Sequence, residues 1–171
     1  MECKRNLYID FDGVIMDTPP LVNCFLAEQG IDRKLAQEDI IRKALTSLCY
    51  KQTLAAAPII SEAFDRINKI IASGKYKVSI LSKVITLEEG VAKVKFLREH
   101  LEDVTIILVP SCVCKTDMVD AKDAILVDDY AGNLRSWQEH GGAGVLFRKN
   151  GKSDKGFPVI GDLSELLELV I

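Results

Sequence analysis

Five short, continuous apolar segments constrain the fold of this chain more than any other feature. They occur at Leu7–Ile9, Val78–Leu81, Val104–Val109, Ala124–Val127 and Gly144–Phe147. A strand covered on one face alternates apolar and polar residues, whereas a strand buried on both faces is apolar throughout. These segments therefore predict strands of a parallel sheet that has helices on both faces.

The stretches between the later strands have helical patterns. "TLEEGVAKVKFLREHL" repeats apolar residues at helical spacing, and Thr86 with Glu89 forms a capping box. "NLRSWQEHGG" predicts a short helix that ends at glycine, and "DLSELLELVI" predicts a closing helix with Asp162 as its N-cap. Strands that alternate with helices predict an open α/β sheet of about five strands with right-handed crossovers.

Residues 18–73 interrupt this alternation, because they contain no convincing strand. "PPLVNCFLAEQG", "DRKLAQEDIIRKALTSL" and "PIISEAFDRINKIIASG" all have helical patterns. A single crossover between parallel strands needs only about a dozen residues. We therefore predict an α/β core of residues 1–17 and 74–171, with residues 18–73 inserted as an all-helical cap. The alternative is that these helices pack on the sheet as ordinary crossovers.

The bulk properties exclude several classes of protein. The length of 171 residues suits one domain with a modest insertion, and the formal charge of −3 provides no electrostatic basis for binding nucleic acid or an anionic membrane. The longest apolar run is far shorter than the roughly 20 residues of a membrane helix. The odd number of cysteines, five, fits a reducing compartment, so we expect a cytoplasmic protein. Cys112 and Cys114 lack a second Cys or His pair at zinc-like spacing.

Polar side chains follow the predicted strands where each strand ends. In chain order these residues are Asp10 and Asp12, then Ser82, then Lys115 in the loop after the third strand, then Asp128 and Asp129. Ligands of open α/β sheets bind at the carboxyl edge of the strands. We therefore expect two acid pairs, a hydroxyl and a lysine to meet at this edge.

This set of side chains suits phosphoryl transfer. Carboxylate oxygens suit Mg²⁺, and one aspartate beside the metal can attack phosphorus. An acid two residues further on can protonate a leaving group and later activate water. A lysine and a hydroxyl can hold the remaining phosphate oxygens. Gly13 lets the backbone turn away from the strand without steric cost.

Other motif classes fit the sequence less well. An EF-hand has glycine at the sixth position of its loop and Glu at the twelfth, whereas Gly13 comes fourth in "DFDG". Neither a P-loop lysine motif nor G-x-G-x-x-G occurs. A signal-receiver domain expects its phosphorylated Asp after a middle strand and its lysine after the last strand. The order of Asp10 and Lys115 does not match that arrangement.

Four segments, in order and across nearly the whole chain, resemble the four motifs of the haloacid-dehalogenase-like (HAD) superfamily of phosphotransferases. They are Asp10-Phe11-Asp12-Gly13-Val14, Ser82, Lys115 and Asp128-Asp129. The resemblance implies a Rossmann-like core with a helical cap, with Asp10 as nucleophile and Asp12 as general acid and base. It also implies that Mg²⁺ is held by Asp10, by the backbone carbonyl of Asp12 and by Asp128 or Asp129. Ser82 and Lys115 would bind the substrate phosphate.

Within the superfamily, the flanks "DFDGVIMD", "CKTDMV" and "ILVDDYAGNL" are most similar to the 5'-nucleotidase/deoxyribonucleotidase branch. This similarity implies a small phosphorylated substrate, with deoxyribonucleoside monophosphates as the leading named candidates. Lys83, directly after Ser82, departs from the pattern, and it either adds positive charge for phosphate or lies on the surface. Asp17 either contributes to the surroundings of the metal or starts the first cap helix.

The sequence therefore predicts a Mg²⁺-dependent phosphomonoester hydrolase that forms an aspartyl-phosphate. A phosphotransferase or mutase, which passes the phosphoryl group to an organic acceptor, is one alternative. A non-catalytic phosphate- or nucleotide-binding regulator is another, although a pure binder has no need of Asp12. The sequence makes no prediction of oligomeric state.

Overall fold

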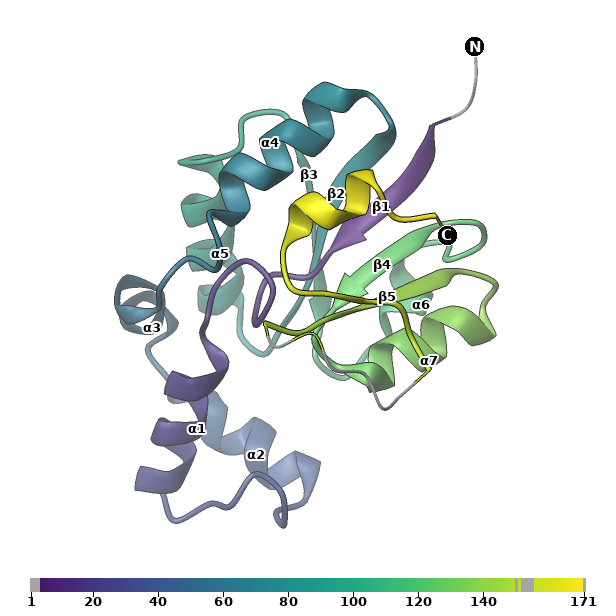
Figure 1. The fold of residues 1–171 in the computed structure, drawn as a ribbon. Coiled ribbons are helices and arrows are strands. Elements are labelled where there is room, and N and C mark those ends of the chain that lie inside the picture. Colours follow the sequence, from purple (N-terminus) through teal and green to yellow (C-terminus); the bar gives the residue numbers. More distant parts are fainter. Residues whose placement is uncertain (1–3, 150, 152–155, 171) are drawn as a thin grey trace.

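A computed structural model of the protein describes residues 4–149, 151 and 156–170. The strands are β1 (Arg5–Ile9), β2 (Tyr76–Val84), β3 (Thr105–Pro110), β4 (Ile125–Asp128), β5 (Ala143–Phe147) and β6 (Val159–Ile160). They form one parallel sheet in the order β3-β2-β1-β4-β5-β6 (Figure 1). The predicted α/β fold is confirmed. The sixth strand has only two residues, which is too short to produce an apolar run.

The helices differ in part from the predicted ones. They are α1 (Pro19–Glu28), α2 (Glu38–Leu45), α3 (Tyr50–Ala56), α4 (Ala63–Ser73), α5 (Leu87–Arg98), α6 (Lys115–Met118) and α7 (Ala131–Glu139), with a 3₁₀ helix η1 (Leu163–Leu167). The predicted closing helix is therefore wrong in type. Asp162 does cap it, by accepting a hydrogen bond from the backbone N–H of Ser164 (2.8 Å). Such 3₁₀ segments are typically short.

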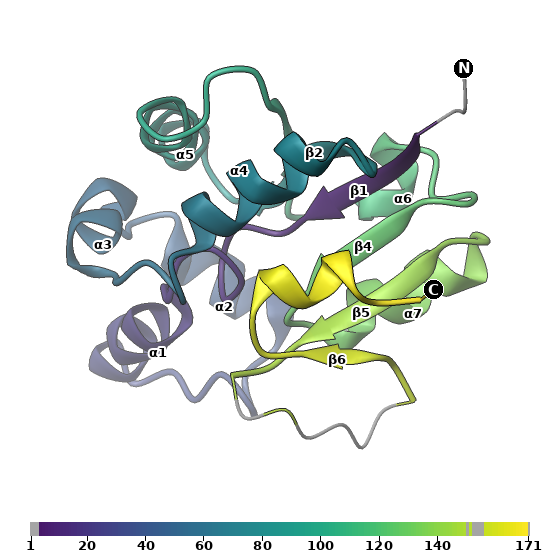
Figure 2. The ribbon, with the colours of Figure 1, turned by 45° about the horizontal axis from the view of Figure 1, so that its top comes forward.

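Both faces of the sheet are covered by helices (Figures 1 and 2). Ile67 of α4 and Leu97 of α5 belong to the apolar core on one face, together with residues of η1. Leu134 and Trp137 of α7 belong to the core on the other face. Trp137 is fully buried, and its Nε1 donates to the carbonyl of Ala124 (3.2 Å). This double coverage explains why the strand segments are largely apolar rather than alternating.

The helices of the 18–73 segment do not all pack in the same way. Helices α1 and α2 lie apart from the sheet at the lower left of Figure 1, and together with α3 they form what we call the cap lobe, residues 19–56. Helix α4, in contrast, contacts β2 and η1 and contributes to the sheet core. The division into core and cap at residues 18–73 stays a prediction, and the packing associates α4 with the core.

The two connections between the cap lobe and the core run side by side. The backbone N–H of Asp17 donates to the carbonyl of Pro58 (3.0 Å), and the N–H of Ile60 donates to the carbonyl of Ile15 (2.9 Å). Asp17 also forms an ion pair with Lys149, with 2.7 Å between Oδ2 and Nζ. The two backbone hydrogen bonds join the segment that leaves the core to the segment that returns to it.

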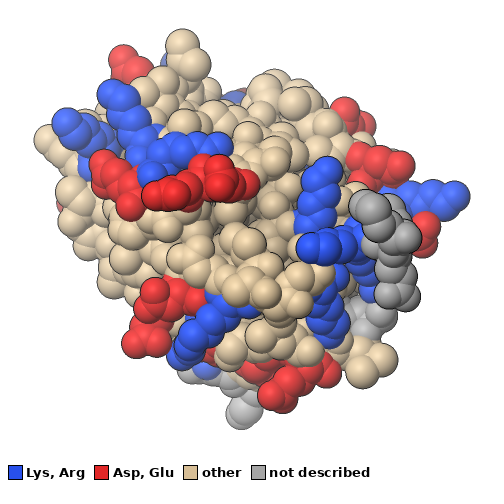
Figure 3. All heavy atoms as spheres, turned by 90° about the horizontal axis from the view of Figure 1, so that it is seen from above, with Lys and Arg blue, Asp and Glu red and all other residues tan. Residues whose placement is uncertain are grey.

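The surface combines charges of both signs. On the face shown in Figure 3, acidic and basic side chains lie next to one another, in line with the small formal net charge. Among the described residues, no helix has both the length and the apolar character needed to cross a bilayer. Four cysteines in the described ranges are free and exposed: Cys24, Cys49, Cys112 and Cys114.

Candidate active site

The loop after β1 places two aspartates at the carboxyl edge of the sheet. The backbone N–H of Asp10 donates to the carbonyl of Val127 (2.9 Å), which continues the pairing of β1 with β4. Gly13 follows with a φ of +76°, and a side chain there would collide with the carboxylate of Asp129. Glycine is therefore required at this position both for its backbone conformation and for the close approach of Asp129.

Three aspartates from two neighbouring strands form an acidic cluster: Asp10, Asp128 and Asp129. Each offers a carboxylate oxygen that lies within 4.8 Å of the other two. The Nζ of Lys115, which is almost fully buried, lies 2.9 Å from Oδ1 of Asp10 and 2.7 Å from Oδ2 of Asp128. The structure thus brings together four of the residues that the sequence predicted to meet. The acidic cluster is the only group of three or more potential metal ligands among the described residues.

Asp128 and Asp129 have different surroundings. Asp128 is fully buried and accepts hydrogen bonds from the backbone N–H of Tyr130 (2.8 Å) and from Nδ2 of Asn133 (2.9 Å). Asp129 is partly exposed, and no donor to its carboxylate is recorded among the described residues. The backbone carbonyl of Asp129 accepts a hydrogen bond from Arg148 (2.6 Å).

The acidic cluster carries more negative charge than Lys115 neutralises. Burial raises the pKa of Asp10 to about 8. The charge of Lys115 opposes this rise, and the neighbouring carboxylates add to it. Burial and the charge of Asp128 raise the pKa of Asp129 to about 6. Burial by itself lowers the pKa of Lys115, but Asp10 and Asp128 raise it above its ordinary value. A bound divalent cation would stabilise the ionised carboxylates, so these residues fit Mg²⁺.

Asp12 belongs to a separate set of contacts, which we call the Asp12 network (Asp12, Thr18, Tyr50 and Lys93). The hydroxyl of Thr18 donates to Oδ1 of Asp12 (2.6 Å), and the hydroxyl of Tyr50 donates to the same oxygen. The fully buried Nζ of Lys93 donates to Oδ2 of Asp12 (2.6 Å). Tyr50 comes from α3 in the cap lobe, and Lys93 comes from α5.

Lys93 connects Asp12 to three further residues of the core. Its Nζ donates to Oγ of Ser82 (3.1 Å) and to the carbonyl of Lys83 (2.7 Å), and it lies 2.8 Å from Oε1 of Glu89. The recorded side-chain contacts of Ser82 are thus to Lys93 and to the Lys83 carbonyl (3.4 Å), rather than to Lys115. Thr86 caps α5 as predicted. The return hydrogen bond of the predicted capping box differs, because Oε2 of Glu89 accepts from the backbone N–H of Ile85 (2.8 Å).

The Asp12 network keeps Asp12 ionised in this arrangement. Burial, the largest single effect, raises the pKa of Asp12, but the charge of Lys93 and the hydrogen bonds from Lys93, Thr18 and Tyr50 together outweigh it and lower the pKa below its ordinary value. Burial by itself lowers the pKa of Lys93, and Asp12 with Glu89 raises it above its ordinary value. The roles of Lys93 and Tyr50 were not predicted from the sequence. The available signal was a lysine on the buried face of α5, between Gly90 and Leu97.

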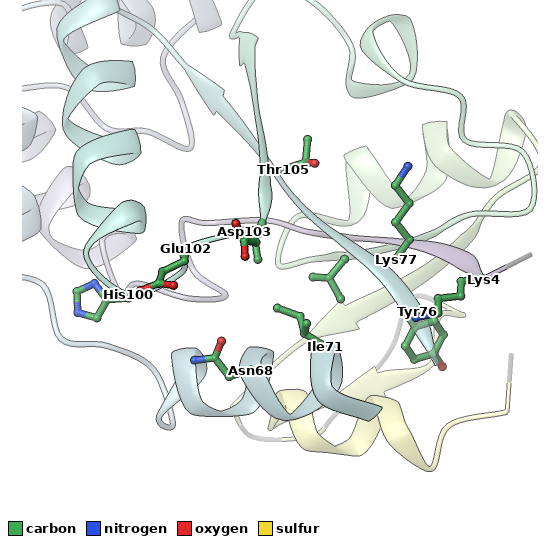
Figure 4. Close-up of a pocket in the computed structure, with 11 residues that line it drawn as sticks. Lys4, Asn68, Ile71, Tyr76, Lys77, His100, Glu102, Asp103 and Thr105 are labelled. Atoms are coloured by element: carbon green, nitrogen blue, oxygen red, sulfur yellow. The ribbon is translucent and has the colours of Figure 1, made fainter. Parts of the chain in front are cut away.

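Two cavities lie at opposite ends of the sheet. A cavity of about 200 Å³, the side cavity, adjoins Asp12 between the cap lobe and the segment that joins β2 to α5. A larger cavity of about 1080 Å³ lies beside the first residues of β2 and β3, where Tyr76 and Thr105 line it (Figure 4). The acidic cluster follows the opposite, carboxyl ends of its strands, so of these two cavities the side cavity is the one at the same edge of the sheet.

No protein-family model matches this chain, and a search of curated proteins finds no significant match. Solved structures match it over nearly its full length. YfnB from Bacillus subtilis, described as a HAD-hydrolase bound to magnesium, is 14% identical with a TM-score of 0.64 over 98% of each chain. A phosphonoacetaldehyde hydrolase-like protein from Oleispira antarctica is 12% identical with a TM-score of 0.63, over 95% of this chain and 90% of that chain.

A third match is the D,D-heptose 1,7-bisphosphate phosphatase from Burkholderia thailandensis. It is 16% identical with a TM-score of 0.56, over 95% of this chain and 96% of that chain. At these levels of identity the three matches show a shared fold. The chain therefore has the α/β fold of HAD-superfamily hydrolases.

Proposed function

We propose that this chain is a Mg²⁺-dependent phosphomonoester hydrolase that forms an aspartyl-phosphate on Asp10. The observation that carries the proposal is the acidic cluster, which lies with Lys115 at the carboxyl edge of the sheet. The chain also has the fold of HAD-superfamily hydrolases, one of which was solved with magnesium bound. In this proposal Asp10 is the nucleophile and Asp12 is the general acid and base.

The metal would be held by Asp10, by the backbone carbonyl of Asp12 and by Asp128 or Asp129. When bound, Mg²⁺ would neutralise charge on the carboxylates and on the phosphoryl oxygens. The raised pKa of Asp10 supports a cation at this point, because a nucleophile must be ionised. The carboxylate of Asp129, which has no recorded donor among the described residues, has lone pairs available for a ligand bond.

The reaction would proceed in two displacements. A carboxylate oxygen of Asp10 attacks phosphorus, the bond from phosphorus to the alcohol oxygen breaks, and Asp12 supplies the proton that the alcohol needs. A water molecule then attacks phosphorus and gives a proton to Asp12, and the bond to Asp10 breaks to release inorganic phosphate. The ammonium of Lys115 stabilises the charge on the phosphoryl oxygens, and the Ser82 hydroxyl would assist in holding them.

The contacts of Asp12 fit its role as a base. Three donors keep its carboxylate ionised here, as the second displacement requires. To act as an acid in the first displacement, Asp12 must carry a proton, so one of these donors must give way to the substrate oxygen. Tyr50 is the donor that belongs to the cap lobe, so movement of the lobe would release it.

The test is a panel of phosphomonoesters with and without Mg²⁺, with inorganic phosphate as the readout. The panel includes nucleoside monophosphates, to which the motif flanks point, together with sugar phosphates and 4-nitrophenyl phosphate. We expect turnover that EDTA abolishes, that Mg²⁺ restores and that Asp10→Asn lowers by orders of magnitude. Activity unchanged after thorough chelation would contradict the metal assignment. Turnover without phosphate release would favour a phosphotransferase, and binding without turnover would favour a regulator.

A further inference from the structure

The side cavity lies on the part of the site where the leaving group would sit. Asp12 lines it, whereas none of the three aspartates of the acidic cluster does. In the proposed reaction Asp12 protonates the leaving group, so the non-phosphoryl part of the substrate must extend past Asp12. The walls of this cavity therefore describe the part of the substrate that distinguishes one phosphomonoester from another.

The volume of the side cavity restricts the leaving group to a small one. About 200 Å³ equals the share of roughly seven molecules of liquid water. Pockets for drug-sized ligands, a class that includes nucleosides, span roughly 300–1,000 Å³. The only aromatic side chain that lines the cavity among the described residues is Tyr50, whose ring lies 4.8 Å from the ammonium of Lys93. A base would have little surface on which to stack.

The two acidic side chains of the cavity are already neutralised in part. Asp12 and Glu89 both form ion pairs with Lys93, at 2.6 and 2.8 Å. Glu89 also accepts a hydrogen bond from a backbone N–H, so its carboxylate is committed to the protein. Neither acid is therefore free to bind a cationic substrate.

The two basic side chains of the cavity have no acidic partner among the described residues. Lys83 is half-buried, and no hydrogen bond or ion pair of its ammonium is recorded there. Arg33 donates to Oδ1 of Asn23, a neutral group (3.0 Å). Together with Lys93, these cations exceed the two acids of the cavity by one positive charge. This arrangement favours an anionic ligand.

The remaining walls of the cavity are largely apolar and come from both parts of the molecule. They include Val22, Leu45 and Leu48 of the cap lobe and Val84 of β2. A short carbon chain that ends in an anionic group matches these walls in size, polarity and charge. We infer that the side cavity selects phosphomonoesters of small organic acids, with Lys83 and Arg33 as the residues that determine specificity. This inference rests on the proposed function of the same site.

Two substrates of nearly equal size test the inference. 3-Phosphoglycerate and glycerol 3-phosphate have the same three-carbon skeleton and differ in a carboxylate in place of a hydroxymethyl group. We expect kcat/KM to be about tenfold or more higher for 3-phosphoglycerate, because a charge-assisted hydrogen bond is roughly twice as strong as a neutral one. Both should exceed adenosine monophosphate, which the cavity is too small to hold.

Substitutions test which residues determine the preference for 3-phosphoglycerate. Lys83→Met and Arg33→Met should each reduce the preference for 3-phosphoglycerate about tenfold, mainly through KM, with a much smaller effect on glycerol 3-phosphate. Lys77→Met, on the same strand as Lys83, and Lys43→Met, in the cap lobe, replace exposed lysines that do not line the cavity. These two control variants should keep the preference of the unmodified protein.

Binding measurements distinguish a failure of this inference from a failure of the proposed function. Calorimetry with the Asp10→Asn protein measures the affinity for both substrates without turnover. Selective binding of 3-phosphoglycerate that Lys83→Met abolishes would support the inference even if the unmodified protein turned over no phosphomonoester. Turnover of 4-nitrophenyl phosphate without any selection for the carboxylate would overturn the inference and leave the proposed function in place. An equal loss for both substrates in Lys83→Met would also overturn it, because Lys83 would then bind the phosphoryl group.

Discussion

Lys93→Met removes one buried ammonium and with it the contacts that hold Asp12. Nζ of Lys93 lies 2.6 Å from Asp12 and 2.8 Å from Glu89, and the side chain is 0% exposed. Methionine has a similar length and shape, so the change removes charge and leaves no large cavity. Two carboxylates then remain near an apolar interior without their shared cation.

Removing one partner of a buried ion pair costs about 3–5 kcal/mol. The side chain of Asp12 is 30% exposed and that of Glu89 is 12% exposed, so both retain some contact with water. We therefore expect the lower end of this range, about 3 kcal/mol of unfolding free energy. For a chain of this length, that loss corresponds to a fall in Tm of about 6–12 °C.

Urea unfolding followed by circular dichroism measures this loss. The midpoint should fall in Lys93→Met while the m-value is retained. Lys95→Met replaces an exposed lysine on the same helix and should change the unfolding free energy by less than about 0.5 kcal/mol. Glu89→Gln in the Lys93→Met background should recover part of the loss, because one uncompensated charge is removed. A Lys93→Met protein as stable as the Lys95→Met control would refute the account of the Asp12 network.

Three further predictions concern the acidic cluster and its surroundings. In EDTA, the pKa of Asp129 is raised from 3.8 to about 6 in the folded protein. Its contribution to the free energy of unfolding is therefore complete below about pH 4 and is lost as the pH rises through 6. The free energy of unfolding relative to Asp129→Asn should therefore fall across this window in urea titrations, and a flat difference would contradict the assignment. Steady-state kinetics should show a loss of about 10²–10³ in kcat for Lys115→Met and a smaller loss for Ser82→Ala, and a normal Lys115→Met enzyme would refute the role of that lysine. Gly13→Ala should weaken Mg²⁺ binding in calorimetry by displacing Asp129, whereas Gly30→Ala, which has a similar φ but open space around it, should leave Mg²⁺ affinity unchanged.

The strands and the acids that follow them could be predicted because their signals are local. An apolar run of three to six residues buried on both faces can be recognised without knowledge of its neighbours. Parallel strands then place their carboxyl ends at one edge, so Asp10, Lys115 and Asp128 meet although they are far apart in sequence. Strand β6 could not be predicted, since two residues produce no pattern.

The Asp12 network could not be predicted in the same way. Lys93 lies 81 residues from Asp12, and Tyr50 lies 38 residues from it. Their contacts depend on how α5 packs against β2 and on where the cap lobe places α3. The sequence of α5 marks Lys93 only as a polar residue on a buried face, with no indication of its partner.

By itself, the sequence of this protein determined the α/β class, the order of five strands along the chain and the identity of the acids and the lysine at the strand ends. These follow from short-range patterns and from the geometry common to all parallel sheets. Only the tertiary structure decided that α4 packs on the sheet, that Ser82 contacts Lys93, and that Lys83 and Arg33 line one small cavity beside Asp12. These relations join segments that are distant in sequence, and they depend on the packing of whole helices, which no local pattern specifies.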